Sequence, residues 1–139
     1  MLVLGRKELE RLLTPAAVIR AVESAFARYA RGEATVPSRL ALTAEEGGLL
    51  LLMPSALAGT ALGAKLVSVY PKNRERGLPT IFATYVLMEP GTGRPLALLE
   101  GGFLTGIRTG ATSALAARYL ARPDSRVIAC FGAGVQAAF

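Results

Sequence analysis

The sequence predicts an α+β domain in which a largely antiparallel or mixed sheet is flanked by helices, followed by the start of a second unit. Several β-like runs follow one another between residues 39 and 99 without an intervening helix, which favours antiparallel pairing. Segments with helical spacing precede and follow these runs. Near the C-terminal end, an apolar run leads into a glycine-rich turn, a pattern typical of a parallel β–α unit.

The N-terminal part is predicted to hold a short strand and two helices. Leu2–Leu4 is expected to form the strand and Arg6–Leu13 a short helix. A longer helix is predicted over Thr14–Arg31, with Thr14 as N-cap and Pro15 in the first helical position. Its apolar residues at helical spacing are Val18, Val22, Phe26 and Tyr29.

The middle of the chain is predicted to be rich in strands. The predicted strands are Arg39–Thr43, Leu49–Met53, Ala61–Tyr70, Thr80–Glu89 and Leu96–Leu99. Helical character returns over Gly102–Ala121, which carries a row of small residues suited to close packing. Arg126–Phe131 is then predicted as a buried strand.

The composition indicates a globular protein with a large apolar core. Of the 139 residues, 52% are hydrophobic and 19% are charged, which excludes a disordered tail. The longest uncharged apolar stretch, residues 47–64, is interrupted by glycine and proline, so no membrane span is expected. No N-terminal export signal is recognisable, and we therefore expect a cytoplasmic location.

Several classes of chemistry have few candidate residues. The chain has one cysteine, Cys130, and no histidine, which argues against a metal site and against a Ser-His-Asp triad. The net charge of +6 points to an anionic partner. Because the basic residues are scattered and tryptophan is absent, small anions are favoured over nucleic acid.

The turn after the last predicted strand fits a dinucleotide-binding fingerprint. Gly132, Gly134 and Ala137 match the pattern G-x-G-x-x-(G/A) directly after an apolar run. The two glycines would allow a tight turn and a close approach to a pyrophosphate. An ordinary glycine-rich turn remains an alternative, because the rest of the fingerprint would lie beyond Phe139. We therefore expect the chain to be a truncated piece of a longer protein.

Three basic residues stand in otherwise uncharged surroundings. Lys65 lies within a strand whose two faces are mostly apolar, where a lysine must find an anion or lose its proton. Arg108 lies in an uncharged helical stretch, and its planar guanidinium suits a carboxylate. Simple exposure of either side chain to solvent is the alternative. Arg39, at the start of a strand, carries no signal by itself.

With these motifs in view, the chain resembles the ornithine cyclodeaminase and mu-crystallin family of NAD(P)-dependent enzymes. The resemblance covers essentially the whole chain, with several motifs in the same order. These motifs are Pro37-Ser38-Arg39, Met53-Pro54, Gly63-Ala64-Lys65, Tyr70-Pro71-Lys72-Asn73, Gly77-Leu78-Pro79-Thr80, Ile107-Arg108-Thr109-Gly110-Ala111 and the run from Phe131 to Ala137. Family members continue into a Rossmann domain and pair through their first-domain sheets.

The resemblance implies a site for a small amino or imino acid. Arg39, Lys65 and Arg108 would bind its carboxylate, and Lys65 would also take part in catalysis. The residues implied to contact NAD or NADP are Thr80, Arg108, Thr109, Gly132, Gly134, Val135 and Gln136. The reaction implied is hydride transfer at the α-carbon, as in ornithine cyclodeaminases, alanine dehydrogenases or ketimine reductases.

One departure from the family pattern concerns the substrate. In the cyclodeaminases an acidic residue that receives the distal amine of ornithine stands two positions before the Met-Pro pair, where this chain has Leu51. An aliphatic side chain offers that ammonium group no partner. The resemblance therefore implies a small or apolar amino or imino acid rather than ornithine.

The predicted organisation is a substrate-binding and dimerisation domain over residues 1–122 and the start of a Rossmann domain over residues 123–139. We expect a homodimer, since an apolar sheet with open edges tends to pair with a second copy. NAD or NADP would bind this chain weakly or not at all, because most of the cofactor domain is missing. A non-catalytic dimeric module is the alternative function. Neither a membrane nor nucleic acid is expected as a partner.

Overall fold

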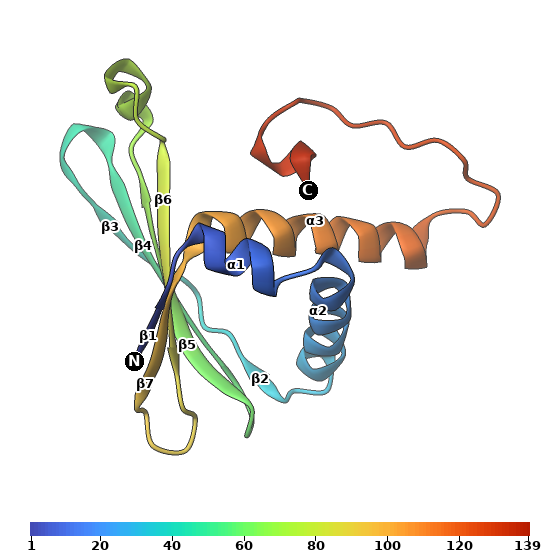
Figure 1. Cartoon of the computed structure of the whole chain (residues 1–139), viewed down its shortest axis with the longest axis horizontal. Coiled ribbons are helices and arrows are strands. Elements are labelled where there is room, and N and C mark those ends of the chain that lie inside the picture. Colours follow the sequence, from blue (N-terminus) through green and yellow to red (C-terminus); the bar gives the residue numbers. More distant parts are fainter.

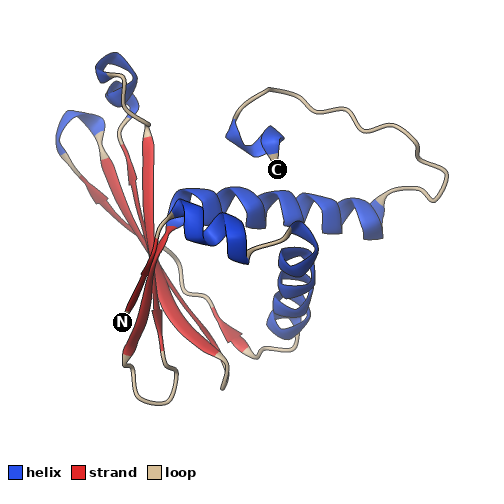
Figure 2. Ribbon diagram, in the orientation of Figure 1, coloured by secondary structure: helices blue, strands red, loops and turns tan.

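A seven-stranded sheet with three α-helices on one of its faces forms the body of the protein (Figures 1 and 2). The computed structural model describes residues 1–139. The strands are β1 (Leu2–Leu4), β2 (Ala34–Thr35), β3 (Leu40–Thr43), β4 (Leu49–Leu57), β5 (Ala61–Val69), β6 (Ile81–Met88) and β7 (Pro95–Glu100). The helices are α1 (Arg6–Leu12), α2 (Pro15–Ala30) and α3 (Gly101–Leu120). The predicted α+β class is confirmed.

The sheet is mixed, with a single parallel pair at one edge. The strand order is β1-β7-β6-β5-β4-β2, and β3 also pairs with β4. β1 runs parallel to β7, while all the other pairs are antiparallel. In the centre of the sheet, Lys65 on β5 lies opposite Met53 on β4 and Tyr85 on β6. This register places one charged residue in the middle of an apolar sheet.

Helix α2 forms where its capping residues predict it. Thr14 accepts a hydrogen bond from the Ala17 amide at 3.3 Å, and Pro15 occupies the first helical position. The helix ends before Gly32, whose φ of +75° is in the left-handed region that favours glycine.

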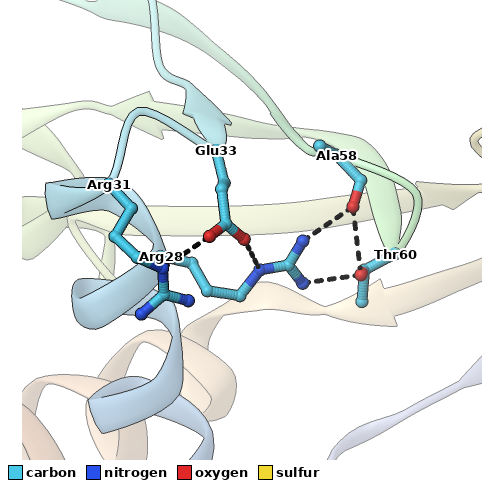
Figure 3. A network of polar contacts seen from close by, with 5 residues as sticks. All are labelled: Arg28, Arg31, Glu33, Ala58 and Thr60. Carbon is cyan, nitrogen blue, oxygen red and sulfur yellow. Dashed lines mark hydrogen bonds and ion pairs between the residues drawn. The ribbon is translucent and has the colours of Figure 1, made fainter.

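A polar network fastens the C-terminal end of α2 to the β4–β5 turn (Figure 3). The Arg28 guanidinium donates to Glu33 Oε2 at 2.7 Å, to Thr60 Oγ1 at 2.6 Å and to the Ala58 carbonyl at 2.7 Å. Arg31 pairs with the other Glu33 oxygen at 2.5 Å. The Ala58 amide also donates to the Glu33 carbonyl at 2.9 Å. The helix is thereby held against the end of the hairpin.

The apolar core lies mainly between α2 and α3. Val18 on α2 packs with Ile107 and Ala111 on α3, and all three side chains are buried. Phe26 and Tyr29, which share the predicted apolar face of α2, remain 52% and 57% exposed. The N-terminal half of α2, with Val18, therefore supplies the core, while its C-terminal half, with Phe26 and Tyr29, stays partly exposed to solvent.

The C-terminal segment differs from the prediction. Residues 126–131 form no strand, and the predicted buried strand is wrong: Ile128 and Phe131 are 88% and 99% exposed. A strand needs a neighbour to satisfy its backbone hydrogen bonds, and no strand of this chain pairs with the segment. The segment ends in a single 3₁₀ turn over Val135–Ala138. Phe139 then packs on α3, with its ring centroid 5.5 Å from that of Phe103.

The second face of the sheet carries no helix (Figure 2). Strand register and alternation assign to this face Leu42, Leu50, Leu52, Ala64, Leu66, Ser68, Phe82, Thr84, Val86 and Leu98. Apart from Ser68 and Thr84, this set is apolar. No helix has both the length and the apolar character needed to span a bilayer.

The Arg28 network generates a prediction about stability. We expect Arg28→Ala to lower the free energy of unfolding by about 1–3 kcal/mol, because it removes hydrogen bonds from groups held between helix and hairpin. Urea denaturation measures the effect. Arg31→Ala is the matched control: Arg31 is more exposed, with a single ion pair, and should have a clearly smaller effect. Equal effects of the two substitutions would contradict the assignment.

Candidate functional site: a cationic cavity between the sheet and α3

A cavity of about 550 Å³ lies between the centre of the sheet and α3. Its floor comes from β4, β5 and β6, its roof from α3, and its rim from the segment that joins β2 to β3. The lining residues are Val36, Pro37, Arg39, Met53, Pro54, Ser55, Lys65, Tyr85, Leu104, Thr105 and Arg108. This volume lies in the range of small-molecule sites.

Three cations share this cavity without an acidic partner. Arg39, Lys65 and Arg108 all line it, and no aspartate or glutamate does. None of the three takes part in an ion pair within the chain. Like charges gathered around one space repel each other unless an anion joins them. The cavity is therefore a candidate site for an anion.

Lys65 lies at the floor of the cavity and is only partly exposed. Its Nζ donates a long hydrogen bond of 3.4 Å to Thr105 Oγ1 on α3. Burial lowers the pKa of Lys65 below its ordinary value, and the nearby charges of Arg108 and Arg39 lower it further. A bound carboxylate would act in the opposite direction and favour the charged lysine.

The start of α3 brings its polar residues over the sheet. Glu100 caps the helix by accepting hydrogen bonds from the amides of Gly102 and Phe103 at 2.6 and 2.8 Å. Gly101 lies so close to β6 that a Cβ there would come within 2.7 Å of Ala83. The first turns of α3 therefore lie against the sheet, and Arg108 extends to the cavity from the second turn.

A glycine on β5 makes room for the aromatic side of the cavity. A Cβ at Gly63 would lie 2.7 Å from the Tyr85 hydroxyl and 2.5 Å from the Val86 carbonyl oxygen. Gly63 is two residues from Lys65 and shares its face of the sheet. The Tyr85 side chain can thus cross the neighbouring strand and form part of the cavity wall.

The other residues predicted to contact a cofactor do not line this cavity. Thr80 precedes β6, where its carbonyl accepts from the Tyr70 amide at 2.8 Å. The Thr109 hydroxyl donates to the Thr105 carbonyl at 2.7 Å. Gly132, Gly134, Val135 and Gln136 belong to the C-terminal segment beyond α3.

The glycine motif does not have the geometry of a dinucleotide site in this chain. Gly132 has a φ of +102°, which suits a glycine turn. However, no strand precedes the turn, and only the four residues Val135–Ala138 follow it in a 3₁₀ turn. A pyrophosphate site needs a strand, a turn and a helix N-terminus together. The residues present therefore do not form a complete cofactor site.

Sequence reasoning missed three polar residues of the cavity, Ser55, Tyr85 and Thr105. Tyr85 lies directly opposite Lys65 on the neighbouring strand, and Thr105 contacts Lys65 from α3 across 40 residues of sequence. The alternation of β6 could have placed Tyr85 on the face of Lys65, once the register was known. The contact with Thr105 depends on tertiary packing alone.

Comparison with known proteins establishes the family. The model of the ornithine cyclodeaminase/mu-crystallin family matches residues 1–139. The chain belongs to this family. It is 43% identical over 138 residues to an alanine dehydrogenase of Archaeoglobus fulgidus, and this match covers 99% of the chain and 42% of the relative.

Solved structures of the family share the fold. One is a Δ1-pyrroline-2-carboxylate reductase of Thermococcus litoralis in complex with NADH and L-proline, with 48% identity and a TM-score of 0.92. Another is an archaeal alanine dehydrogenase dimer with bound NAD, with 41% identity and a TM-score of 0.93. Each match covers 99% of this chain, which spans 43% and 42% of the two structures.

The lowered pKa of Lys65 predicts that its positive charge lowers the free energy of unfolding by an amount that depends on pH. The folded state binds the Lys65 proton less tightly than the unfolded state, so the charged lysine destabilises the fold at neutral pH. This cost decreases as the pH rises through the folded pKa and disappears above the unfolded pKa of about 10.4. Relative to wild type, Lys65→Met should therefore be most favourable at pH 7 and lose this advantage towards pH 10.

Urea denaturation at pH 7 to 10 measures this difference in the free energy of unfolding. Lys7→Met, at an exposed position of α1, provides the control for the loss of a lysine. A difference in the free energy of unfolding between Lys65→Met and wild type that stays constant or grows with pH would contradict the expected cost of the partly buried Lys65 charge.

Proposed function

We propose that this chain is the substrate-binding part of an NAD(P)-dependent enzyme that transfers a hydride at the α-carbon of an amino or imino acid. The observation that carries the proposal is the cavity with three cations and no acidic side chain. Arginine and lysine around a partly buried space suit the carboxylate of a small acid. L-Proline and alanine, which figure in the names of the solved and curated relatives, both carry an α-carboxylate.

In this proposal the cations fix the substrate by its carboxylate. Arg39 and Arg108 hold the oxygen atoms from the rim and from α3, while Lys65 Nζ donates from the floor. Loss of a hydride from the α-carbon and a proton from the amino nitrogen would convert an amine to an imine. A nicotinamide cofactor, when bound, supplies the acceptor or donor of that hydride. We assign no step to the glycine motif of this chain, since its cofactor site is incomplete.

We also propose that the uncovered face of the sheet pairs with a second copy of the chain. A compact protein of 14.5 kDa exposes about 6,900 Å² by the usual size scaling, whereas this chain exposes 9819 Å². The extended C-terminal segment contributes to the excess. The uncovered apolar face around Leu66 and Val86 contributes as well, and a sheet normally covers such a face.

The proposed function predicts carboxylate binding that depends on the three cations. L-Alanine and pyruvate should bind the chain, and Lys65→Met or Arg108→Leu should weaken binding at least tenfold by removing a charged donor. Titration calorimetry and amide chemical shifts measure the affinity. Lys7→Met is the matched control and should bind like wild type.

Binding of the same strength to Lys65→Met would contradict the carboxylate site. Absence of all carboxylate binding, together with a stable dimer, would favour the alternative of a non-catalytic dimeric module.

The dimer has its own test at a position that does not disturb the fold. Thr84 lies in the middle of the uncovered face and is exposed. Thr84→Arg should therefore shift the chain from dimer to monomer in sedimentation velocity at micromolar concentration, because it places a long, charged side chain in a mostly apolar interface. Thr43→Arg, also exposed but on the opposite face, is the control. A wild-type monomer at these concentrations would contradict the proposal.

A further inference from the structure

One hydroxyl group in the cationic cavity is hydrogen-bonded differently from the others on its helix. Helix α3 carries four serine or threonine side chains, Thr105, Thr109, Thr112 and Ser113. The hydroxyls of the last three donate to the backbone carbonyl four residues earlier, at 2.7, 2.9 and 3.2 Å. Serine and threonine within a helix commonly bond in this way. The Thr105 hydroxyl makes no such bond and instead accepts a hydrogen bond from Lys65 Nζ at 3.4 Å.

The direction of this bond leaves the hydroxyl hydrogen of Thr105 available. An ammonium group only donates, so Thr105 Oγ1 must be the acceptor. The hydroxyl hydrogen can then serve a second partner, and no hydrogen bond within the chain uses it. Lys65 has three N–H donors and uses one of them on Thr105. Both groups therefore have donors left for a ligand in the cavity.

Thr105 lies on the side of α3 that faces the sheet. The helix begins at the sheet and runs away from it, so only its first turns border the cavity (Figure 1). Thr105 follows Gly101, which touches β6, by four residues and precedes Arg108 by three. Residues at these spacings share one face of a helix. Thr105 and Arg108 line the cavity together with Arg39 and Lys65. A small acid bound by the cations would therefore lie next to Thr105 as well.

We propose that Thr105 is a further substrate-binding residue of the cationic cavity, which accepts a hydrogen bond from Lys65 and donates its hydroxyl hydrogen to the carboxylate that the cations hold. This inference rests on the proposed function, since it needs a carboxylate in the cavity. Because Lys65 occupies the acceptor side of the hydroxyl, the hydrogen is directed away from the lysine. A neutral donor strengthens anion binding without adding a fourth positive charge to three that already repel each other.

The same hydroxyl supports the charged form of Lys65. Burial and the charges of Arg108 and Arg39 lower the pKa of this lysine. A hydrogen bond that the charged form donates acts in the opposite direction and raises the pKa. The charged and titratable groups that line the cavity with Lys65 are Arg39, Arg108 and Tyr85, and no carboxylate is among them. Thr105 is the one lining residue that accepts a hydrogen bond from Lys65.

The first experiment removes the hydroxyl and keeps the shape of the side chain. Thr105→Val replaces the hydroxyl with a methyl group, whereas Thr105→Ser keeps the hydroxyl. Pyruvate and L-alanine are titrated into the chain of 139 residues by calorimetry. Thr105→Val should weaken the binding of both acids roughly tenfold or more, as expected for the loss of a hydrogen bond to a charged group. Thr105→Ser should stay within about threefold of wild type.

Thr112→Val is the matched control on the same helix. Thr112 is half-buried, its hydroxyl donates to the Arg108 carbonyl, and it does not line the cationic cavity. This variant should bind both acids like wild type. Thr105→Ala is a second variant without the hydroxyl. Valine and alanine differ in helix preference, so a loss of affinity that both variants share reports the hydroxyl and not a local change in the helix.

The second experiment measures the pKa of Lys65 by NMR through the signal of its Cε atom, which Lys65→Met identifies by its loss. Thr105→Val should lower this pKa below the wild-type value, because the ammonium loses its acceptor. Thr105→Ser should restore the pKa, and Thr112→Val should leave it unchanged. The binding titrations are carried out at a pH well below the Lys65 pKa of every variant. A difference in affinity then reports the hydroxyl and not the protonation of the lysine.

The outcomes separate this inference from the proposed function. Pyruvate affinity that falls in Lys65→Met but not in Thr105→Val would overturn the role of Thr105 and leave the carboxylate site standing. Binding by Thr105→Ser as weak as that by Thr105→Val would assign the effect to the methyl group and overturn the inference as well. So would an unchanged Lys65 pKa in Thr105→Val. If neither acid binds the wild-type chain, the proposed function fails and the inference fails with it.

Discussion

The sheet carries helices on only one of its two faces, and this one-sided cover determines where each kind of chemistry can lie. On the covered face, α2 and α3 pack on each other around Val18 and Ile107 and leave space between themselves and the strands. That space is lined by side chains of alternate residues, including Lys65 and Tyr85. On the other face the alternate residues are almost wholly apolar. One register therefore produces both a polar cavity and an apolar surface.

The cationic cavity has a cost for the fold that a ligand would remove. Burial and two neighbouring guanidinium groups both disfavour the charged form of Lys65. A fold selected for stability alone would replace such a lysine with an apolar residue. A carboxylate between the three cations would reverse the effect and stabilise the folded state by binding it alone. The unfavourable electrostatic surroundings of the charged Lys65 thus support an anionic ligand on physical grounds, independently of the family.

Local signals in the sequence predicted the elements well where those signals decide the structure. Thr14 and Pro15 specify the start of α2, and apolar runs bounded by turn residues specify β5 and β6. The short strand β2 and the parallel pairing of β1 with β7 went unpredicted, because both depend on a neighbour distant in sequence. Residues 126–131 show the converse case: an apolar run has strand propensity, but it cannot form a strand without a partner.

The candidate site was predictable only in part for the same reason. Unpaired cations in an apolar sequence indicated that Lys65 and Arg108 need an anion, yet nothing in their spacing shows that they share a cavity with Arg39. The apolar side chains of α2 had an even less visible role. Helical spacing predicts that Phe26 and Tyr29 belong to the core, and a core residue and a pocket wall have the same pattern.

Only the way in which α2 is anchored shows which of its apolar residues belong to the core and which line a cavity. Arg28 holds the C-terminal end of the helix to the β4–β5 turn, and a cavity of about 470 Å³ beside Phe26 and Tyr29 stays open, while Val18 closes the core at the N-terminal end. The position of one helix therefore sets both the stability of the fold and the space that adjoins the cationic cavity. A change that moved α2 towards the sheet would bury Phe26 and Tyr29, gain apolar contact and fill that space.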